Sequence, residues 1–120
     1  MRVQLNILII ARIIAVLATA ATGLLALIKP AAAYEFTGLN PTSVRGVSEI
    51  RAIFGGLFIG LGLAPLFLGL VAYQLLGIGY LAITAARGFS ILFDKSYAQS
   101  NLISLGIEIV LGIVLVIPGG

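Results

Sequence analysis

Long uncharged apolar runs, separated by shorter polar segments, dominate the pattern of this chain. The longest run, from Ala52 to Ala86, has no charged side chain and is bracketed by Arg51 and Arg87. A single membrane-spanning helix needs roughly 20 apolar residues, so this run is too long for one span. Because backbone polar groups in lipid must be bonded internally, long apolar runs without alternation predict helices. The run therefore predicts a helical hairpin with its turn near Gly69.

Four apolar segments are long enough to be transmembrane helices. The sequence predicts them at residues 5–28, 48–68, 72–93 and 99–117. The only long polar segment, residues 29–47, contains prolines and glycines that favour turns and is expected to be a linker. The predicted fold is all-α: a polytopic integral membrane protein in which four transmembrane helices form a bundle, with residues 1–120 as a single membrane domain.

The composition supports a membrane location and excludes several kinds of chemistry. Of the 120 residues, 61% are hydrophobic and only 9% are charged, whereas soluble domains average about 25% charged residues. Cysteine, histidine and tryptophan are absent, which excludes disulfides, Cys/His metal sites and Ser-His-Asp or Cys-His catalytic machinery. We therefore expect no enzyme activity, no metal and no cofactor, whereas contact with lipid or pigment stays open.

The positions of the positive side chains favour one orientation in the membrane. On the side of the two linkers the cationic residues are Lys29, Arg45, Arg51, Arg87 and Lys95. The side of the termini has Arg2 and Arg12. Positively charged loops tend to stay in the cytoplasm, which predicts cytoplasmic linkers and external termini in a bacterial inner or photosynthetic membrane. The net charge of +3 favours contact with anionic lipid over nucleic acid.

Small residues recur four positions apart in the first two spans. They are Ala11, Ala15, Thr19 and Gly23 in the first span and Ala52, Gly56, Gly60 and Ala64 in the second. Residues four apart share a helix face, and small side chains let two membrane helices approach closely. We expect the two spans to pack through these stripes within one chain. Dimerisation, or docking onto a larger partner, is the alternative use of the same faces.

Polar residues of the last two spans also gather on one face of each helix. These are Tyr73, Gly77, Tyr80, Thr84 and Arg87 in the third span, and Ser104, Glu108 and Gly112 in the fourth. If the fourth span begins at Gln99, Glu108 lies about 13 Å along it. Arg87 lies at a similar depth in the third span, so the two side chains can reach each other.

Charged side chains within lipid are expected to face one another, because an unpaired charge there is costly. The predicted buried cluster consists of Arg51, Arg87 and Glu108, with Tyr80 and Thr84 as hydrogen-bond partners. Arg12 is a competing partner for Glu108, unless its side chain extends to the surface on the side of the termini. Such a cluster either fixes which helix faces which, or binds a ligand, a proton or a lipid headgroup.

A run of specific residues resembles a known family. Residues 49–56 read Glu-Ile-Arg-Ala-Ile-Phe-Gly-Gly and are followed by Gly60, Gly62, Ala86-Arg87-Gly88, Ser90, Asp94 and Glu108. In these residues the chain resembles DUF4345, a family of small four-helix bacterial membrane proteins of unknown function. It departs from the expected pattern at two positions. Ala86 stands where the pattern has glycine before the arginine, and Lys95 stands where the pattern has the glycine of an Asp-Gly turn. The resemblance implies four helices and no particular activity.

Two functions are consistent with the sequence. The first is a structural or accessory subunit of a larger membrane complex, such as a photosynthetic or respiratory one, in contact with lipids and other membrane subunits. The small-residue stripes and short loops favour it. The second is a small lipid- or quinone-binding or transport protein that uses the buried Arg/Glu cluster. An intramembrane enzyme would have only Glu108, Asp94 and tyrosine and lysine side chains for its chemistry.

Overall fold

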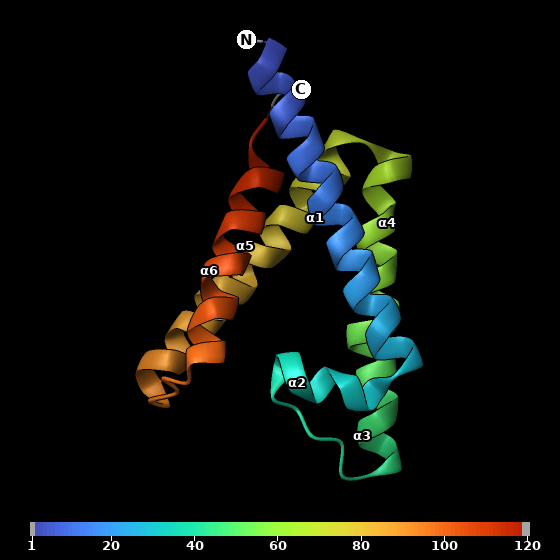
Figure 1. Cartoon of the computed structure of the whole chain (residues 1–120), viewed down its shortest axis with the longest axis vertical. Coiled ribbons are helices and arrows are strands. Elements are labelled where there is room, and N and C mark those ends of the chain that lie inside the picture. Colours follow the sequence, from blue (N-terminus) through green and yellow to red (C-terminus); the bar gives the residue numbers. More distant parts are fainter. Residues whose placement is uncertain (1, 119–120) are drawn as a thin grey trace. The chain divides into compact units, whose positions relative to one another are not determined.

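The computed structural model of the chain is all-α over the residues it describes, 2–118, with side chains described for residues 6–35 and 37–118 (Figure 1). Within that part, the helical segments long and apolar enough to cross a membrane are Asn6–Ile28, Val44–Leu68, Leu70–Phe93 and Gln99–Val116. Each overlaps one predicted span. The prediction of an all-α chain with four long apolar helices is therefore confirmed.

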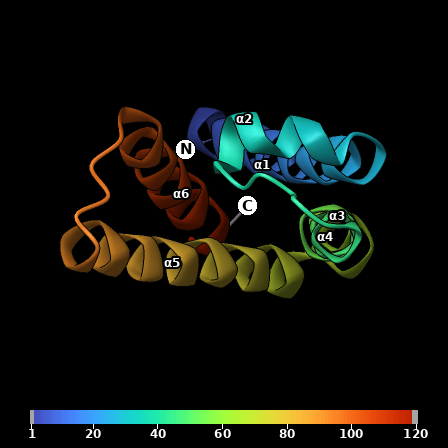
Figure 2. The ribbon, with the colours of Figure 1, turned by 90° about the horizontal axis from the view of Figure 1, so that it is seen from below.

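The helices follow one another with short connections. In chain order they are α1 (Arg2–Ile28), η1 (Pro30–Ala32), α2 (Ala33–Thr37), α3 (Val44–Glu49), η2 (Ile50–Leu57), α4 (Phe58–Leu68), α5 (Leu70–Phe93) and α6 (Gln99–Val116). The segment η2 is π-helical, a form with i→i+5 hydrogen bonds that is uncommon at this length. Helices α3, η2 and α4 are continuous, and Figure 2 looks down their common axis.

Two local signals explain where the second long helix begins and ends. The Ser43 side chain accepts a hydrogen bond from the Gly46 amide at 3.0 Å, an N-terminal cap, so the helix begins at Val44 rather than at residue 48. At the other end, Gly69 has φ of +83°, a conformation that only glycine adopts readily. The break between the second and third spans therefore falls at the predicted glycine.

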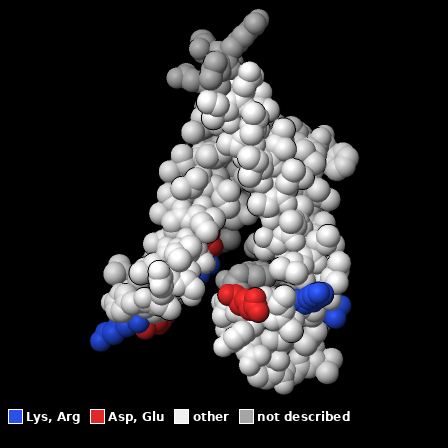
Figure 3. All heavy atoms as spheres, in the orientation of Figure 1, with Lys and Arg blue, Asp and Glu red and all other residues white. Residues whose placement is uncertain are grey.

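The chain forms two compact units. The central unit is Ile14–Phe67, and the terminal unit combines Met1–Ile13 with Leu68–Gly120. In Figure 3 the visible charged atoms form a few small groups, and uncharged atoms cover most of the face shown.

In the central unit, α1 packs against η2 and α4 through glycines. A Cβ atom added at Gly23 would lie 2.8 Å from the Gly55 carbonyl oxygen and 2.8 Å from the Ile59 amide nitrogen. A Cβ added at Gly62 would lie 2.9 Å from the Ala20 amide nitrogen. The two backbones therefore touch directly, as expected for small residues between membrane helices.

The glycines of the second span that make this contact differ from those predicted. A Cβ at Gly60 would meet nothing within 4 Å, and one at Gly56 would meet only the Arg51 carbonyl oxygen, at 3.9 Å. The prediction for Gly56 and Gly60 is wrong because glycines lie on two neighbouring faces of this helix. Gly55 and Gly62, seven residues apart and therefore on one face, are the pair that contacts α1. The other predicted packing residues are Ala15, which is buried, and Ala64, which is half-buried.

In the terminal unit, α5 and α6 pack side by side around two further glycines. A Cβ at Gly77 would lie 2.9 Å from the Leu115 Cβ, and a Cβ at Gly112 would lie 2.6 Å from the Leu81 Cδ2. Gly77 and Gly112 both belong to the polar faces identified in the sequence. Those faces are therefore turned toward each other, and this contact positions the charged residues farther along the same helices.

Candidate functional site

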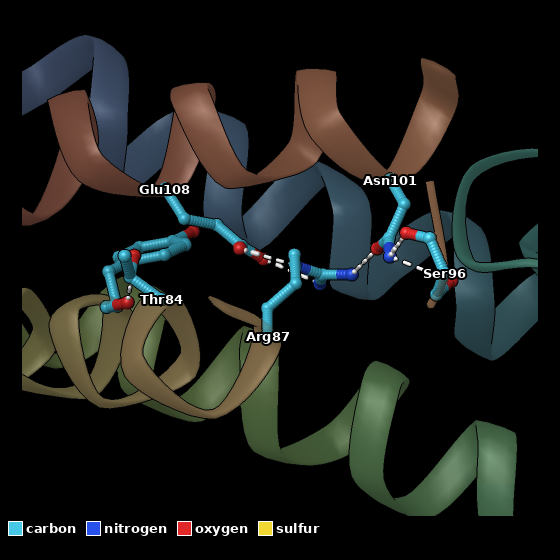
Figure 4. Close-up of polar contacts among 6 residues, drawn as sticks. Thr84, Arg87, Ser96, Asn101 and Glu108 are labelled. Atoms are coloured by element: carbon cyan, nitrogen blue, oxygen red, sulfur yellow. Dashed lines mark hydrogen bonds and ion pairs between the residues drawn. The ribbon is translucent and has the colours of Figure 1, made fainter. Parts of the chain in front are cut away.

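The candidate site is an ion pair between α5 and α6. The Arg87 Nε donates to the Glu108 Oε1 at 2.7 Å, and the Arg87 Nη2 donates to the Glu108 Oε2 at 2.8 Å (Figure 4). Two parallel bonds of this kind match the planar fork of a guanidinium to a carboxylate, and they fix orientation as well as distance. The pair therefore sets both the rotation and the register of α5 against α6.

A hydrogen-bond chain extends from the ion pair to the loop between the two helices. The Arg87 Nη1 donates to the Asn101 Oδ1 at 2.7 Å. The Asn101 amide in turn donates to the Ser96 carbonyl oxygen at 3.2 Å and to the Ser96 hydroxyl at 3.1 Å. In Figure 4 the Arg87 guanidinium lies between Glu108 and Asn101. Each of its three nitrogens thus donates at least one hydrogen bond to the protein.

The sequence analysis missed Asn101 and Ser96. A signal was present, because Asn101 precedes Glu108 by seven residues, or about two turns of an α-helix. The two side chains must therefore lie on the same face of α6. A polar residue two turns from a membrane glutamate is a natural further partner for the arginine that faces it.

The pair is largely withdrawn from the surface. The side chain of Arg87 is 30% exposed and that of Glu108 is 13% exposed. Withdrawing two charges from water is costly unless each recovers hydrogen bonds inside the protein. Both carboxylate oxygens and all three guanidinium nitrogens have such bonds here. The arrangement is therefore that of a satisfied structural clamp.

Thr84, one of the two predicted hydrogen-bond partners, takes a different role. The Thr84 hydroxyl donates to the Tyr80 carbonyl oxygen at 2.9 Å, within α5 itself. A threonine inside a helix commonly bonds the carbonyl four residues earlier, and this explains why Thr84 does not bond the ion pair as expected. Tyr80 is buried on the same helix.

Arg51 belongs to the central unit, where it has another partner. Its Nη1 donates to the Leu27 carbonyl oxygen at 3.0 Å. The last carbonyl groups of a helix have no partner within the helix, and a cation near them is also favoured by the helix dipole. The structure therefore brings together Arg87 and Glu108 from the predicted cluster, and it places Arg51 at the end of α1.

Arg12 also bonds the end of a helix. It is only 4% exposed, its Nη2 donates to the Ile117 carbonyl oxygen, and its guanidinium lies 6.0 Å from the centre of the Tyr73 ring. Gln74 donates to the neighbouring Val116 carbonyl oxygen at 3.2 Å. The free carbonyl groups at the end of α6 attract this cation, whereas Glu108, for which Arg12 was the expected competing partner, is bonded to Arg87.

The match to a known family covers nearly the whole chain. A family model described as a domain of unknown function (DUF4345) matches residues 7–117. The chain belongs to the DUF4345 family. The DUF4345 match confirms the resemblance seen in the sequence and extends it across α1 to the end of α6. No curated protein and no solved structure matched the chain.

The DUF4345 description assigns no activity, so the chemistry must be inferred from the side chains. Among residues 2–118, no group of three or more histidine, cysteine, aspartate and glutamate side chains lies together in a way that could hold a metal ion. In the structure of this DUF4345 chain, Arg87 pairs with Glu108 and Arg45 with Glu49, and Arg12 and Arg51 donate to carbonyl groups at the ends of helices. This chemistry stabilises a helix arrangement.

Proposed function

We propose that the chain is a polytopic integral membrane protein whose four long apolar helices all cross the bilayer as one bundle. The exposed apolar side chains support this proposal. On α6, only 11% of the most apolar stretch is buried, and its exposed residues include Ile103, Ile107 and Val110. Apolar surface on this scale marks contact with lipid or protein rather than with water. The membrane of this proposal is a bacterial inner or photosynthetic membrane, and the distribution of positive charge favours cytoplasmic linkers and external termini.

Within that membrane, the chain acts as a structural or accessory subunit of a larger complex, such as a photosynthetic or respiratory one. The observation that carries this proposal is a set of small residues on the outer face of α5. A Cβ added at Gly79 would meet nothing within 4 Å, and Ala82 and Ala86 on the same side are exposed. Glycine inside a helix costs about 1 kcal/mol relative to alanine.

Close packing of a helix from another subunit would offset the destabilisation that Gly79 causes within α5. Lipid tails do not drive helices together, so membrane helices associate through small residues that allow close backbone contact. The Arg87–Glu108 clamp holds α5 against α6 and so keeps this outer face in a fixed orientation. Partners are therefore other membrane subunits, together with the surrounding lipids.

The alternative function, binding or transport of a lipid or quinone by the charge cluster, has weaker support. The Arg87 guanidinium already donates from each of its nitrogens to a protein acceptor. A ligand that used this guanidinium would have to displace Glu108 or Asn101 and leave a charged or polar group without its partner.

The test compares two neighbouring substitutions on the exposed side of α5. Gly79→Leu fills the small-residue face, whereas Ile78→Leu changes an exposed apolar residue beside it. Each tagged variant is expressed in the native host and extracted in mild detergent. The proposal predicts that Gly79→Leu loses most of its association with the larger complex while Ile78→Leu retains it. Equal retention of both variants would contradict the use of this face.

A further inference from the structure

An open cavity of about 360 Å³ lies in the central unit. It is lined by the loop that precedes α3 and by residues of α3 and η2. The apolar part of its wall consists of Leu39, Pro41, Ile50, Ile53 and Phe54. This volume falls at the lower end of the range for ligand sites, about 300–1,000 Å³. A single hydrocarbon chain or one ring fits such a space better than a whole two-chain lipid.

The π-helical segment supplies one side of this cavity. Ile50, Ile53 and Phe54 all belong to η2, and π-helical turns within longer helices occur frequently at functional sites. Ile50 is 5% exposed and packs with Ala26 and Ala33 in a small buried cluster against which Phe54 rests. This wall of the cavity is therefore held in place before any ligand arrives.

Polar residues of the preceding loop also line the cavity. They include Asn40 and Thr42, which are exposed, and the described part of the chain gives neither side chain a hydrogen-bond partner. Glu49 also lines it, and its Oε1 accepts a hydrogen bond from the Arg45 Nε at 2.9 Å. An apolar wall with a few convergent polar groups is the usual composition of a small-molecule site.

We propose that this cavity binds an uncharged amphipathic molecule, with carbonyl or hydroxyl groups at Asn40 and Thr42 and a hydrocarbon body against Ile50, Ile53 and Phe54. Because Glu49 is paired with Arg45, these two side chains together add no net charge to the pocket, which suits an uncharged ligand. A neutral glycerolipid and a quinone share this chemistry. The proposal does not depend on a partner subunit, because every residue involved lies in the central unit.

The absence of tryptophan from the chain allows a clean fluorescence test. Phe54→Trp places a reporter in the cavity, and Phe89→Trp places a matched reporter on α5, where the side chain is 66% exposed. The full chain is reconstituted in phosphatidylcholine vesicles and titrated with brominated monoacylglycerol or with decylbenzoquinone, both of which quench tryptophan. Leu39→Trp is a second cavity reporter that serves if Phe54→Trp fails to fold.

The site predicts saturable quenching of the cavity reporter at low mole fractions of at least one probe, and non-saturating quenching of the Phe89→Trp reporter. Saturation by only one probe identifies the source of the ligand as lipid or quinone. Asn40→Ala with Thr42→Val weakens binding several-fold. Non-saturating quenching at both reporters would overturn the proposal.

Discussion

The Arg87 guanidinium on α5 and the Glu108 carboxylate on α6 are joined by two parallel hydrogen bonds of 2.7 and 2.8 Å. A bidentate pair tolerates little rotation of either helix. The direct contact of the two helices at Gly77 and Gly112 fixes a second point farther along the same interface. Together these contacts explain how a short hairpin of two apolar helices can present a defined outer face.

Removing one partner of the ion pair is expected to destabilise the protein strongly. Glu108→Leu leaves the Arg87 charge without its acceptor, and losses for broken buried pairs are about 3–5 kcal/mol. Because Arg87 is 30% exposed, a loss of about 2–3 kcal/mol is expected here. Thermal unfolding in detergent measures it. The double variant Arg87→Leu/Glu108→Leu should recover most of the loss, and a double variant as unstable as the single one would argue against the clamp.

Two glycines on α4 test which face of this helix packs against α1. Gly62→Ala places a Cβ 2.9 Å from the Ala20 amide nitrogen, so the helices must separate at a cost of about 1–3 kcal/mol. Gly60→Ala places a Cβ in open space and should be neutral or stabilise by up to about 1 kcal/mol. Unfolding of the two variants under the same conditions decides the matter. A larger loss of stability for Gly60→Ala than for Gly62→Ala would indicate that the face expected from the sequence packs against α1.

Arg12 is expected to stabilise the end of α6. Arg12→Met keeps an apolar side chain of similar length but removes the donor to the Ile117 carbonyl oxygen. The lost charged hydrogen bond is worth about 1.5–3 kcal/mol. Faster amide exchange in the last turn of α6 is the direct readout. Unchanged exchange there, with normal folding, would show that this contact contributes nothing.

The loop between α5 and α6 contains a strained residue. Lys95 has φ of +55°, a left-handed conformation that costs most residues roughly 1–2 kcal/mol and glycine very little. Lys95→Gly should therefore raise the free energy of unfolding by about 1 kcal/mol. Lys95→Ala, which removes the charge but keeps the Cβ, should give no such gain. Equal effects of the two substitutions would point to charge rather than backbone strain.

The sequence predicts much of this fold because the strongest constraint, long apolar runs, is local. It also identifies Arg87 and Glu108 as facing residues, since both depth and helix face follow from position along a regular helix. It fails for Gly56 and Gly60 because glycines occur on two neighbouring faces of the helix, and their spacing does not decide which face packs against α1. It does not reveal that backbone carbonyl groups accept from Arg12 and Thr84, because no residue pattern displays these acceptors.

The departure from the family pattern at Lys95 coincides with an unusual backbone conformation. The sequence resemblance leads one to expect glycine after Asp94, and the structure gives this position a left-handed backbone. The Ser96 and Asn101 hydrogen bonds beside it help to hold the turn without glycine. Such compensation depends on side chains from both ends of the loop, so the position of Lys95 alone does not reveal it.

The central claim is that this chain is a membrane subunit of a larger assembly, and the composition of its native particle tests it most directly. Membranes of the native host are extracted into polymer discs without detergent, and particles that contain the tagged chain are weighed by native mass spectrometry. The account predicts particles far heavier than small multiples of the 12.5 kDa chain, with other membrane polypeptides in constant ratio. Particles that contain only copies of this chain and lipid would contradict it.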